Sequence, residues 1–257
     1  MVKQTGCIRA GVSSLKISPE QISRLGQGME DGYLASLHDH VRDYFPTVAA
    51  VMGDASMDPL VRDALTRARA HGFVGRASVR SYLDLMLLLG AAFDQDPALA
   101  FLRPCLNPDA ERERLAAEAG ENEPPEALEP DPIDMLEAAW EAAWAWLGEV
   151  AGDNYANLYK ALMRLGGHVN SGADTPTDPK TLGHLCARVW PEKAERLGEA
   201  EVVAITAAGL EKAAADGLAT PEAQALMTLV AFVGGWGAHS DAAFAVDGVR
   251  AFAGVVD

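Results

Sequence analysis

The stretch DPIDMLEAAWEAAWAWLGEV, residues 131–150, decides the fold class. It begins with an aspartate and a proline, a pair typical of a helix start, because the carboxylate caps free N–H groups and proline is tolerated in the first turn. Behind this pair, apolar residues form one broad stripe: Met135, Leu136, Ala139, Trp140, Ala143, Trp144 and Leu147. The spacing predicts an amphipathic helix over residues 133–150.

The same kind of start occurs six times along the chain. The pairs are Ser18-Pro19, Asp58-Pro59, Asp96-Pro97, Asp131-Pro132, Asp178-Pro179 and Thr220-Pro221. Each precedes a proline-free stretch long enough for a helix, and Gln21 completes a capping box with Ser18. Since no run of alternating β-branched residues indicates a sheet, the chain is predicted to be all-α.

An internal repeat underlies this pattern. A shift of 145 positions aligns the two halves without a gap and gives 13 identities among the 64 positions from 37 to 100. Alanines inflate chance matches, so the evidence rests on residues with a backbone role. Pro46, Gly53, Gly72, Gly90 and Asp96 fall on Pro191, Gly198, Gly217, Gly235 and Asp241. Glycine ends helices, proline prevents their continuation and aspartate caps the next one.

The repeat predicts two pseudo-repeated helical units joined by an acidic, proline-rich linker and a Trp-rich helix. The first unit covers residues 1–106, the linker covers 107–131, and residues 132–257 hold the Trp-rich helix and the second unit. In each unit a helix ends at Phe45-Pro46 or Trp190-Pro191, and a very apolar helix ends near Gly90 or Gly235.

Charge and cysteine content exclude several classes of protein. The formal net charge of −16 makes general nucleic-acid binding unfavourable and suits a basic protein partner. Three distant cysteines, Cys7, Cys105 and Cys186, predict free thiols in a reducing cytosol. No secretory signal is expected at the N-terminus, and the uncharged residues 223–240 are predicted to be a buried core helix and not a membrane span.

The sequence contains no strong catalytic or metal-binding motif. Nucleotide-binding and hydrolase signatures such as GxxxxGK[ST], GxSxG and HExxH are missing. His38 and His40 lie two residues apart, so on a helix they point in different directions and one metal cannot easily take both. Asp94 and Asp96 could join a hard-cation site, but Asp96 is explained as a helix cap. No catalytic residue, cofactor or metal is predicted, although a Cys–His pair brought together by folding stays open.

One part of the chain resembles a known group of proteins. The run HVRDYFPTVAAVMGDASMDPLVRDALTRARAHGFVGRASVRSYLDLMLLLGAAFDQDPAL, residues 40–99, is similar to small helical proteins of proteobacteria found beside type VI secretion components. The resemblance covers about residues 30–103 and is weakly repeated in 175–248. It departs in the second half, where Asp94 becomes His239 and Pro97 becomes Ala242. It implies an accessory role beside PAAR, VgrG or Rhs-type proteins and carries over no active site.

Three functional hypotheses follow. The first is a non-catalytic adaptor or chaperone that binds a type VI secretion effector or spike component in the cytoplasm. The second is an immunity protein whose acidic surface neutralises a basic toxin, because complementary charge speeds association. The third is that the chain is the effector itself. The partner-binding residues are predicted to be Trp140, Trp144 and Trp146, for which core packing is the alternative.

Overall fold

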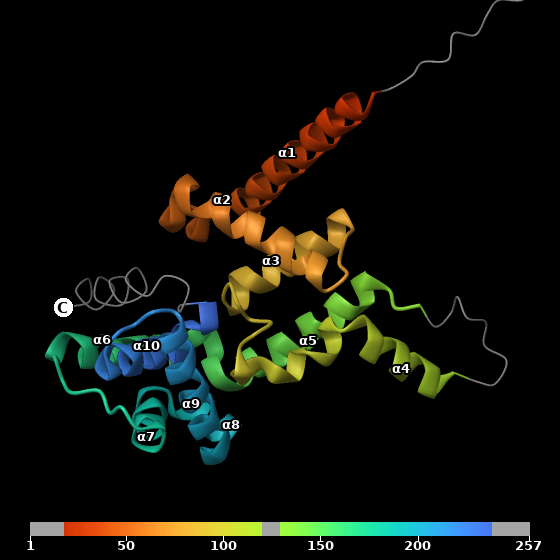
Figure 1. The fold of residues 1–257 in the computed structure, drawn as a ribbon. Coiled ribbons are helices and arrows are strands. Elements are labelled where there is room, and N and C mark those ends of the chain that lie inside the picture. The colour runs from red at the N-terminus through yellow and green to blue at the C-terminus, as the bar shows by residue number, and fades with distance from the viewer. Residues whose placement is uncertain (1–17, 120–128, 238–257) are drawn as a thin grey trace, which may run out of the picture. The chain divides into compact units, whose positions relative to one another are not determined.

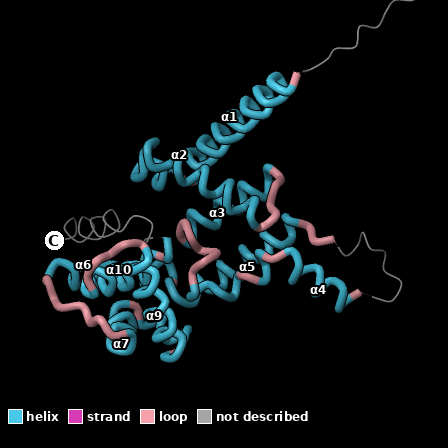
Figure 2. Tube along the Cα trace, viewed as in Figure 1, coloured by secondary structure: helices cyan, strands magenta, loops and turns pink. Residues whose placement is uncertain are grey.

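The structure of the protein, a computed structural model, describes residues 18–119 and 129–237 (Figure 1). All regular secondary structure in these two ranges is helical, which confirms the predicted all-α class (Figure 2). The chain forms two compact units, Met1–Asp58 and Pro59–Asp257. The α-helices are α1 (Pro19–Tyr44), α2 (Pro46–Ala70), α3 (Arg76–Leu89), α4 (Pro108–Glu118), α5 (Pro132–Ala151), α6 (Ala156–Ser171), α7 (Pro179–Val189), α8 (Pro191–Leu197), α9 (Glu199–Ala215) and α10 (Pro221–Gly234). The short 3-10 helices are η1 (Pro97–Leu102), η2 (Pro104–Leu106) and η4 (Asp153–Tyr155).

Five of the six predicted cap-and-proline pairs begin a helix. At α1 the capping box is complete, because Ser18 Oγ accepts from the backbone N–H of Gln21 while the Gln21 side chain accepts from the backbone N–H of Ser18. The prediction for Asp58-Pro59 is wrong, since α2 runs through Pro59. The break in α2 lies earlier, at Gly53, whose φ of 68° and ψ of 167° are open to glycine and strained for other residues.

Helix ends recur at the same 145-residue offset in two segments, residues 34–90 and 179–235, here named the first and second segments. Helix α1 ends at Tyr44 and α7 at Val189 (189 − 44 = 145), while α2 starts at Pro46 and α8 at Pro191 (191 − 46 = 145). Glycines with positive φ occupy matching positions: Gly53, Gly72 and Gly90 match Gly198, Gly217 and Gly235. The backbone therefore follows the same sequence of helices and breaks in both segments. Spatial superposition of the two predicted units stays a prediction.

The core of the unit Pro59–Asp257 is built around two apolar helices. Helix α9 packs against α7 and α10, and α5 packs against α3, α6 and α8. Residues 227–233 of α10 are all buried, which explains the uncharged stretch as core. Gly209 permits the close approach of α9 to α10, because a Cβ there would lie 2.5 Å from Thr228 Cγ2. None of the described helices is both long and apolar enough to span a membrane.

Part of the predicted linker is ordered as a helix. Residues 108–118 form α4, capped by the Asn107 side chain, which accepts from the backbone N–H of Asp109. No residue of α4 is buried, and Arg114 pairs along its surface with Glu111 and Glu118. The linker is thus solvated, as its composition predicts, but residues 108–118 are not an irregular coil. Residues 120–128 of the linker lie outside the described residues.

Candidate functional site

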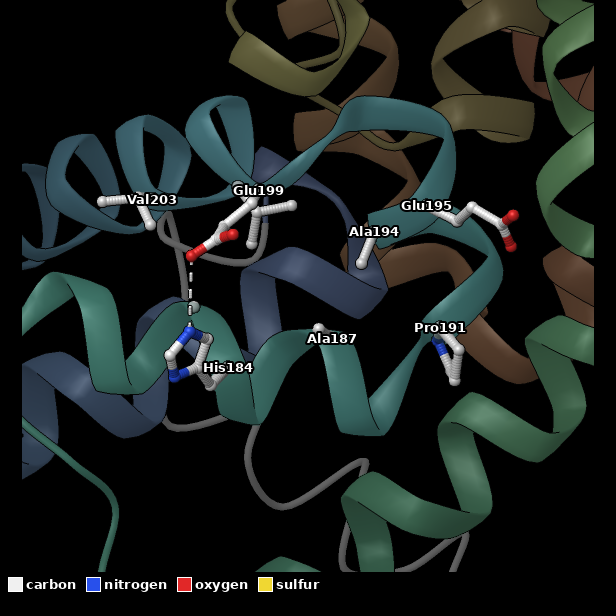
Figure 3. A pocket seen from close by; sticks show the side chains of 9 residues that line it. His184, Ala187, Pro191, Ala194, Glu195, Glu199 and Val203 are labelled. Carbon is white, nitrogen blue, oxygen red and sulfur yellow. Dashed lines mark ion pairs between the residues drawn. The ribbon is translucent and has the colours of Figure 1, made fainter.

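A groove of about 420 Å³ lies between α7, α8 and α9 (Figure 3). Small and apolar side chains make its floor, and charged side chains stand at its edges. The lining residues are Gly183, His184, Ala187, Pro191, Ala194, Glu195, Glu199, Val202 and Val203. This mixture suits the side chain of a partner that has an apolar stem and a charged end.

Local sequence explains how the groove is shaped. Gly183 and Ala187 are spaced four residues apart on α7, so they lie on the same face of the helix. Pro191 starts α8 directly after α7 ends, and α8 itself stops at Gly198, whose φ is 84° and ψ is 154°. The chain turns at this glycine and begins α9 with Glu199. Two helices are thereby placed opposite a face of α7 on which Gly183 and Ala187 have little side-chain bulk.

The charged edge of the groove is open to solvent. His184 Nε2 lies 3.6 Å from Glu199 Oε1 across the groove, with 57% and 74% of the two side chains exposed. Figure 3 shows these side chains pointing toward each other, while Glu195 stands at the other end with its carboxylate turned away from His184. An ion pair this exposed contributes little to stability. Both carboxylates are therefore free to be re-paired by a cationic partner at low cost.

A second notable group, Lys193, is buried in the same unit. Its side chain is 3% exposed, and Nζ donates to the Phe232 carbonyl oxygen at 2.7 Å. The ammonium lies 5.5, 5.0 and 4.8 Å from the ring centroids of Trp146, Trp190 and Phe232. Burial lowers the pKa of Lys193, opposed by the negative charge of Asp96.

The contacts of Lys193 indicate a structural role. The last carbonyls of a helix have no partner within the helix, and a cation near that end is favoured by the helix dipole. Lys193 Nζ is a cation and a hydrogen-bond donor for the Phe232 carbonyl near the end of α10. Near the end of α5, Trp190 Nε1 donates a hydrogen bond to Val150 O at 2.9 Å. Lys193 and Asp96 help to line a cavity of 290 Å³. Because Lys193 of α8 and the neighbouring Trp190 bond to α10 and α5, the groups at the border of this cavity have a structural role.

Asp94 forms a polar cluster with Arg67 and His71. Its Oδ1 accepts from Arg67 at 2.7 Å, and its Oδ2 lies 3.1 Å from His71 Nε2. Burial would raise the pKa of Asp94, but the hydrogen bond with His71 and the charge of Arg67 hold it below its ordinary value. His71 Nδ1 lies 3.1 Å from Leu106 O, so the cluster joins α2, the loop after α3 and η2.

The cation site considered for Asp94 and Asp96 is not assembled. Asp96 is 3% exposed, and its carboxylate accepts the backbone N–H of Ala98 at 2.8 Å, as expected for a helix cap. Burial raises the pKa of Asp96. Within residues 18–119 and 129–237, no three His, Cys, Asp or Glu side chains are grouped so that they could hold a metal ion.

The adjacent residues His38, Asp39 and His40 have different partners. His38 Nε2 lies 3.6 Å from Asp58 Oδ1, whereas Asp39 Oδ1 accepts from Arg42 at 3.2 Å. The His40 ring contacts the Tyr44 ring, with 4.7 Å between the centroids. This separation agrees with the expected divergence of the two histidines on a helix.

The three tryptophans predicted to bind a partner have different environments. Trp146 is buried and packs against Phe101 and beside Lys193, so its ring belongs to the core. Trp144 is 50% exposed and stacks with Trp140, with 6.1 Å between the ring centroids. Partner binding by Trp140 and Trp144 stays a prediction, and for Trp146 the alternative of core packing holds.

The described cysteines lack the features of an activated nucleophile. Cys186 is fully buried, and burial raises the pKa of its thiol to about 12. Burial also raises the pKa of Cys105, and the nearby charge of Glu111 adds to this. A reactive cysteine requires a depressed pKa, because the thiolate is the nucleophile. Cys7 lies outside the described residues.

The groove residues His184 and Glu199 were not predicted as binding residues from the sequence. A signal was present in the repeat alignment, where Ala187 stands 145 positions after Arg42 and Glu199 stands 145 positions after Asp54. A large cationic residue is thus exchanged for a small one while the acidic position is kept.

No protein-family model, curated protein or solved structure matches the chain.

Proposed function

We propose that the protein is a non-catalytic binding protein that holds a basic segment of a protein partner in the groove between α7, α8 and α9. The observation that carries the proposal is the groove of about 420 Å³, with an apolar floor and two exposed carboxylates at its edges. The net charge of −16 adds long-range attraction for a basic partner.

The proposed biological role is that of an adaptor or chaperone for a type VI secretion effector or spike component in the cytoplasm. The family resemblance supports this role, and the acidic groove is compatible with it. An immunity protein is the second candidate, favoured by the same acidic groove, since a basic toxin would be bound through complementary charges. Expression of the toxin alone and together with this protein separates the two, because only an immunity protein protects the cell.

The test of partner binding is capture of partners from the native bacterium with tagged protein. We compare the wild type with the double variant Glu195→Lys, Glu199→Lys, which reverses the charge at both ends of the groove. The matched control is Glu113→Lys, Glu211→Lys, which changes the charge equally at exposed residues outside the groove. We expect the groove variant to lose a stoichiometric partner that the wild type and the control retain.

The rival binding face around the tryptophans is tested in the same experiment. The variant Glu137→Lys, Glu141→Lys alters two exposed carboxylates on α5, the helix that carries Trp140 and Trp144. Loss of the partner from this variant, with full capture by the groove variant, would overturn the proposed site and support the Trp140–Trp144 face. Absence of any partner from the wild type, in cells shown to express their secretion genes, would overturn the binding function.

A further inference from the structure

The groove has a filled counterpart in the first segment. At the offset of 145, Ala187 matches Arg42 and Glu199 matches Asp54 (187 − 42 = 145; 199 − 54 = 145). Arg42 reaches from α1 across to the carboxylate after the Gly53 break, where its Nη2 donates to Asp54 Oδ1 at 2.9 Å. Its Nη1 donates to Asp39 Oδ1 at 3.2 Å.

A second side chain fills the same face of α1. His38 Nε2 lies 3.6 Å from Asp58 Oδ1, and the matching pair in the second segment is Gly183 and Val203. Two large residues of this face of α1, His38 and Arg42, are therefore replaced on α7, one by glycine and one by alanine. A Cβ at Gly183 would lie 3.4, 3.5 and 3.7 Å from Val203 Cγ2, Val202 Cγ1 and Thr206 Oγ1, so a methyl group could fit there while a larger side chain would meet α9.

One part of the arrangement is kept in the second segment. Glu199 places a carboxylate at the start of α9, directly after the Gly198 break, as Asp54 does after Gly53. Glu195 adds a further carboxylate where the first segment has Ala50 (195 − 145 = 50). The second segment thus keeps the Asp54 carboxylate as Glu199 and adds Glu195, while Asp39 and Asp58 are exchanged for His184 and Val203. It lacks the arginine that pairs with Asp39 and Asp54 in the first segment.

We infer that the groove binds an arginine side chain of the partner, with its guanidinium on Glu199 as that of Arg42 lies on Asp54. This inference rests on the proposed function and names the chemistry that the site recognises. The three methylenes of the arginine lie on the floor made by Gly183, Ala187 and Ala194. Arginine fits better than lysine because its planar guanidinium carries several N–H donors, as Arg42 shows by donating from Nη1 and Nη2 to two carboxylates, while an ammonium acts as a point charge.

Binding requires the exposed pair of His184 and Glu199 to separate. Its 3.6 Å distance and high exposure make this inexpensive. The arginine gains a charge-assisted hydrogen bond in exchange, and its stem covers the partly exposed Ala187 side chain.

The inference is tested by titrating ¹⁵N-labelled full-length protein with N-acetyl-arginine methylamide, followed by NMR. The lysine and citrulline analogues are the matched probes, since the first keeps the charge and the second keeps the shape. We expect saturable shifts at the amides of Gly183, Ala187 and Glu199, with affinity about tenfold lower for citrulline because its neutral head loses the charge-assisted bond. Equal shifts with all three probes would overturn the inference.

The variant Ala187→Arg supplies the arginine within the chain, at the position of Arg42. Ala187 is partly exposed, so the longer side chain has room, and an unchanged urea midpoint confirms folding. We expect this variant to lose both arginine binding and partner capture, while the control Ala138→Arg, on the exposed surface of α5, retains both. Should folding fail, Glu199→Gln is the second variant, expected to weaken arginine binding about tenfold.

The outcomes separate the inference from the proposed function. If the double variant Glu195→Lys, Glu199→Lys loses the partner but Ala187→Arg captures it fully, the groove binds the partner without an arginine, and only the inference fails. If the double variant keeps the partner, the proposed function of the groove fails, whatever the arginine titration shows.

Discussion

The first and second segments, residues 34–90 and 179–235, have the same helix ends but use the space between the helices differently. In the first segment Arg42 and His38 pair with Asp54 and Asp58, whereas the second segment has an open groove at the matching place. The second segment also buries Lys193 where the first has the half-buried Val48 (193 − 145 = 48). The prolines and glycines that end the helices are thus shared by the two segments, whereas the side chains between the helices differ.

The largest expected effect concerns Lys193, which distinguishes the segments in their cores. Replacement by methionine removes the hydrogen bond to Phe232 O and leaves Asp96 buried without its positive neighbour. We expect Lys193→Met to reduce the free energy of unfolding by about 3 kcal/mol, because the buried Phe232 carbonyl loses its donor and Asp96 loses a nearby positive charge. Urea denaturation measures it.

Two further variants control this prediction. Adding Asp96→Asn to Lys193→Met removes the buried negative charge, so part of the loss should be recovered. Val48→Ala, at the matching position of the first segment, should cost about 1 kcal/mol because only apolar contacts of a half-buried side chain are lost. Equal losses for Lys193→Met and Val48→Ala would show that the two positions are equivalent after all.

The glycine breaks test what the segments share. Gly53 and Gly198 have φ of 68° and 84° with ψ of 167° and 154°, and a Cβ at either would meet no atom within 4 Å. The cost of alanine is therefore conformational alone, and we expect about 1–3 kcal/mol for each variant in urea denaturation. The two costs should be similar. A cost at only one of the two glycines would contradict a shared backbone path.

These glycines also show how far the sequence determines the fold. Proline, glycine and capping residues act through local backbone geometry, so five of six proline-marked starts and the helix ends before Gly90 and Gly235 could be predicted. The prediction of a helix start at Pro59 is wrong because the local signal of Asp58-Pro59 is outweighed by a helix that already begins after Gly53. Local signals predict a boundary only where no neighbouring helix extends through it.

The candidate site was harder to predict, because its residues are joined only by packing. His184 and Glu199 lie on different helices, and no local pattern states that they face each other across a groove. Likewise, the stripe of α5 does not separate the buried Trp146 from the half-exposed Trp144, since this depends on which helices cover α5. The repeat alignment held the missing information, but only the structure shows that Arg42 reaches Asp54.

The buried thiol gives a pH-dependent test of the comparison. Cys186 and its match Val41 are both fully buried, and the pKa of Cys186 is raised from 9.0 to about 12. The unfolded thiol ionises near pH 9 while the folded thiol stays protonated, so stability present below pH 9 is lost as the pH rises toward 12. Relative to Cys186→Val, we expect the wild type to lose about 2 kcal/mol by about pH 10.5.

The reverse substitution provides the control for this test. Val41→Cys should introduce a similar loss at alkaline pH into the first segment, and neither variant should change the pH dependence near pH 7. Urea denaturation at several pH values measures both. A wild type and a Cys186→Val variant with the same alkaline decline would mean that the thiol ionises freely in the folded protein.

The smallest expected effect on stability comes from opening the filled counterpart of the groove. Arg42→Ala removes two exposed ion pairs, with Asp39 and Asp54, so the urea midpoint should hardly change. The same variant leaves the exposed Asp54 carboxylate beside a small residue and without its guanidinium partner, as Glu199 lies exposed on the groove that Ala187 also lines. N-acetyl-arginine methylamide should then shift the amides of Asp39 and Asp54 in an NMR titration, and more strongly when His38→Gly is added. One outcome would be that the opened site of Arg42→Ala does not bind arginine while the groove of the second segment does. In that case Glu195 and His184 determine the recognition of arginine, and the acidic position that the segments share, Asp54 and Glu199, does not.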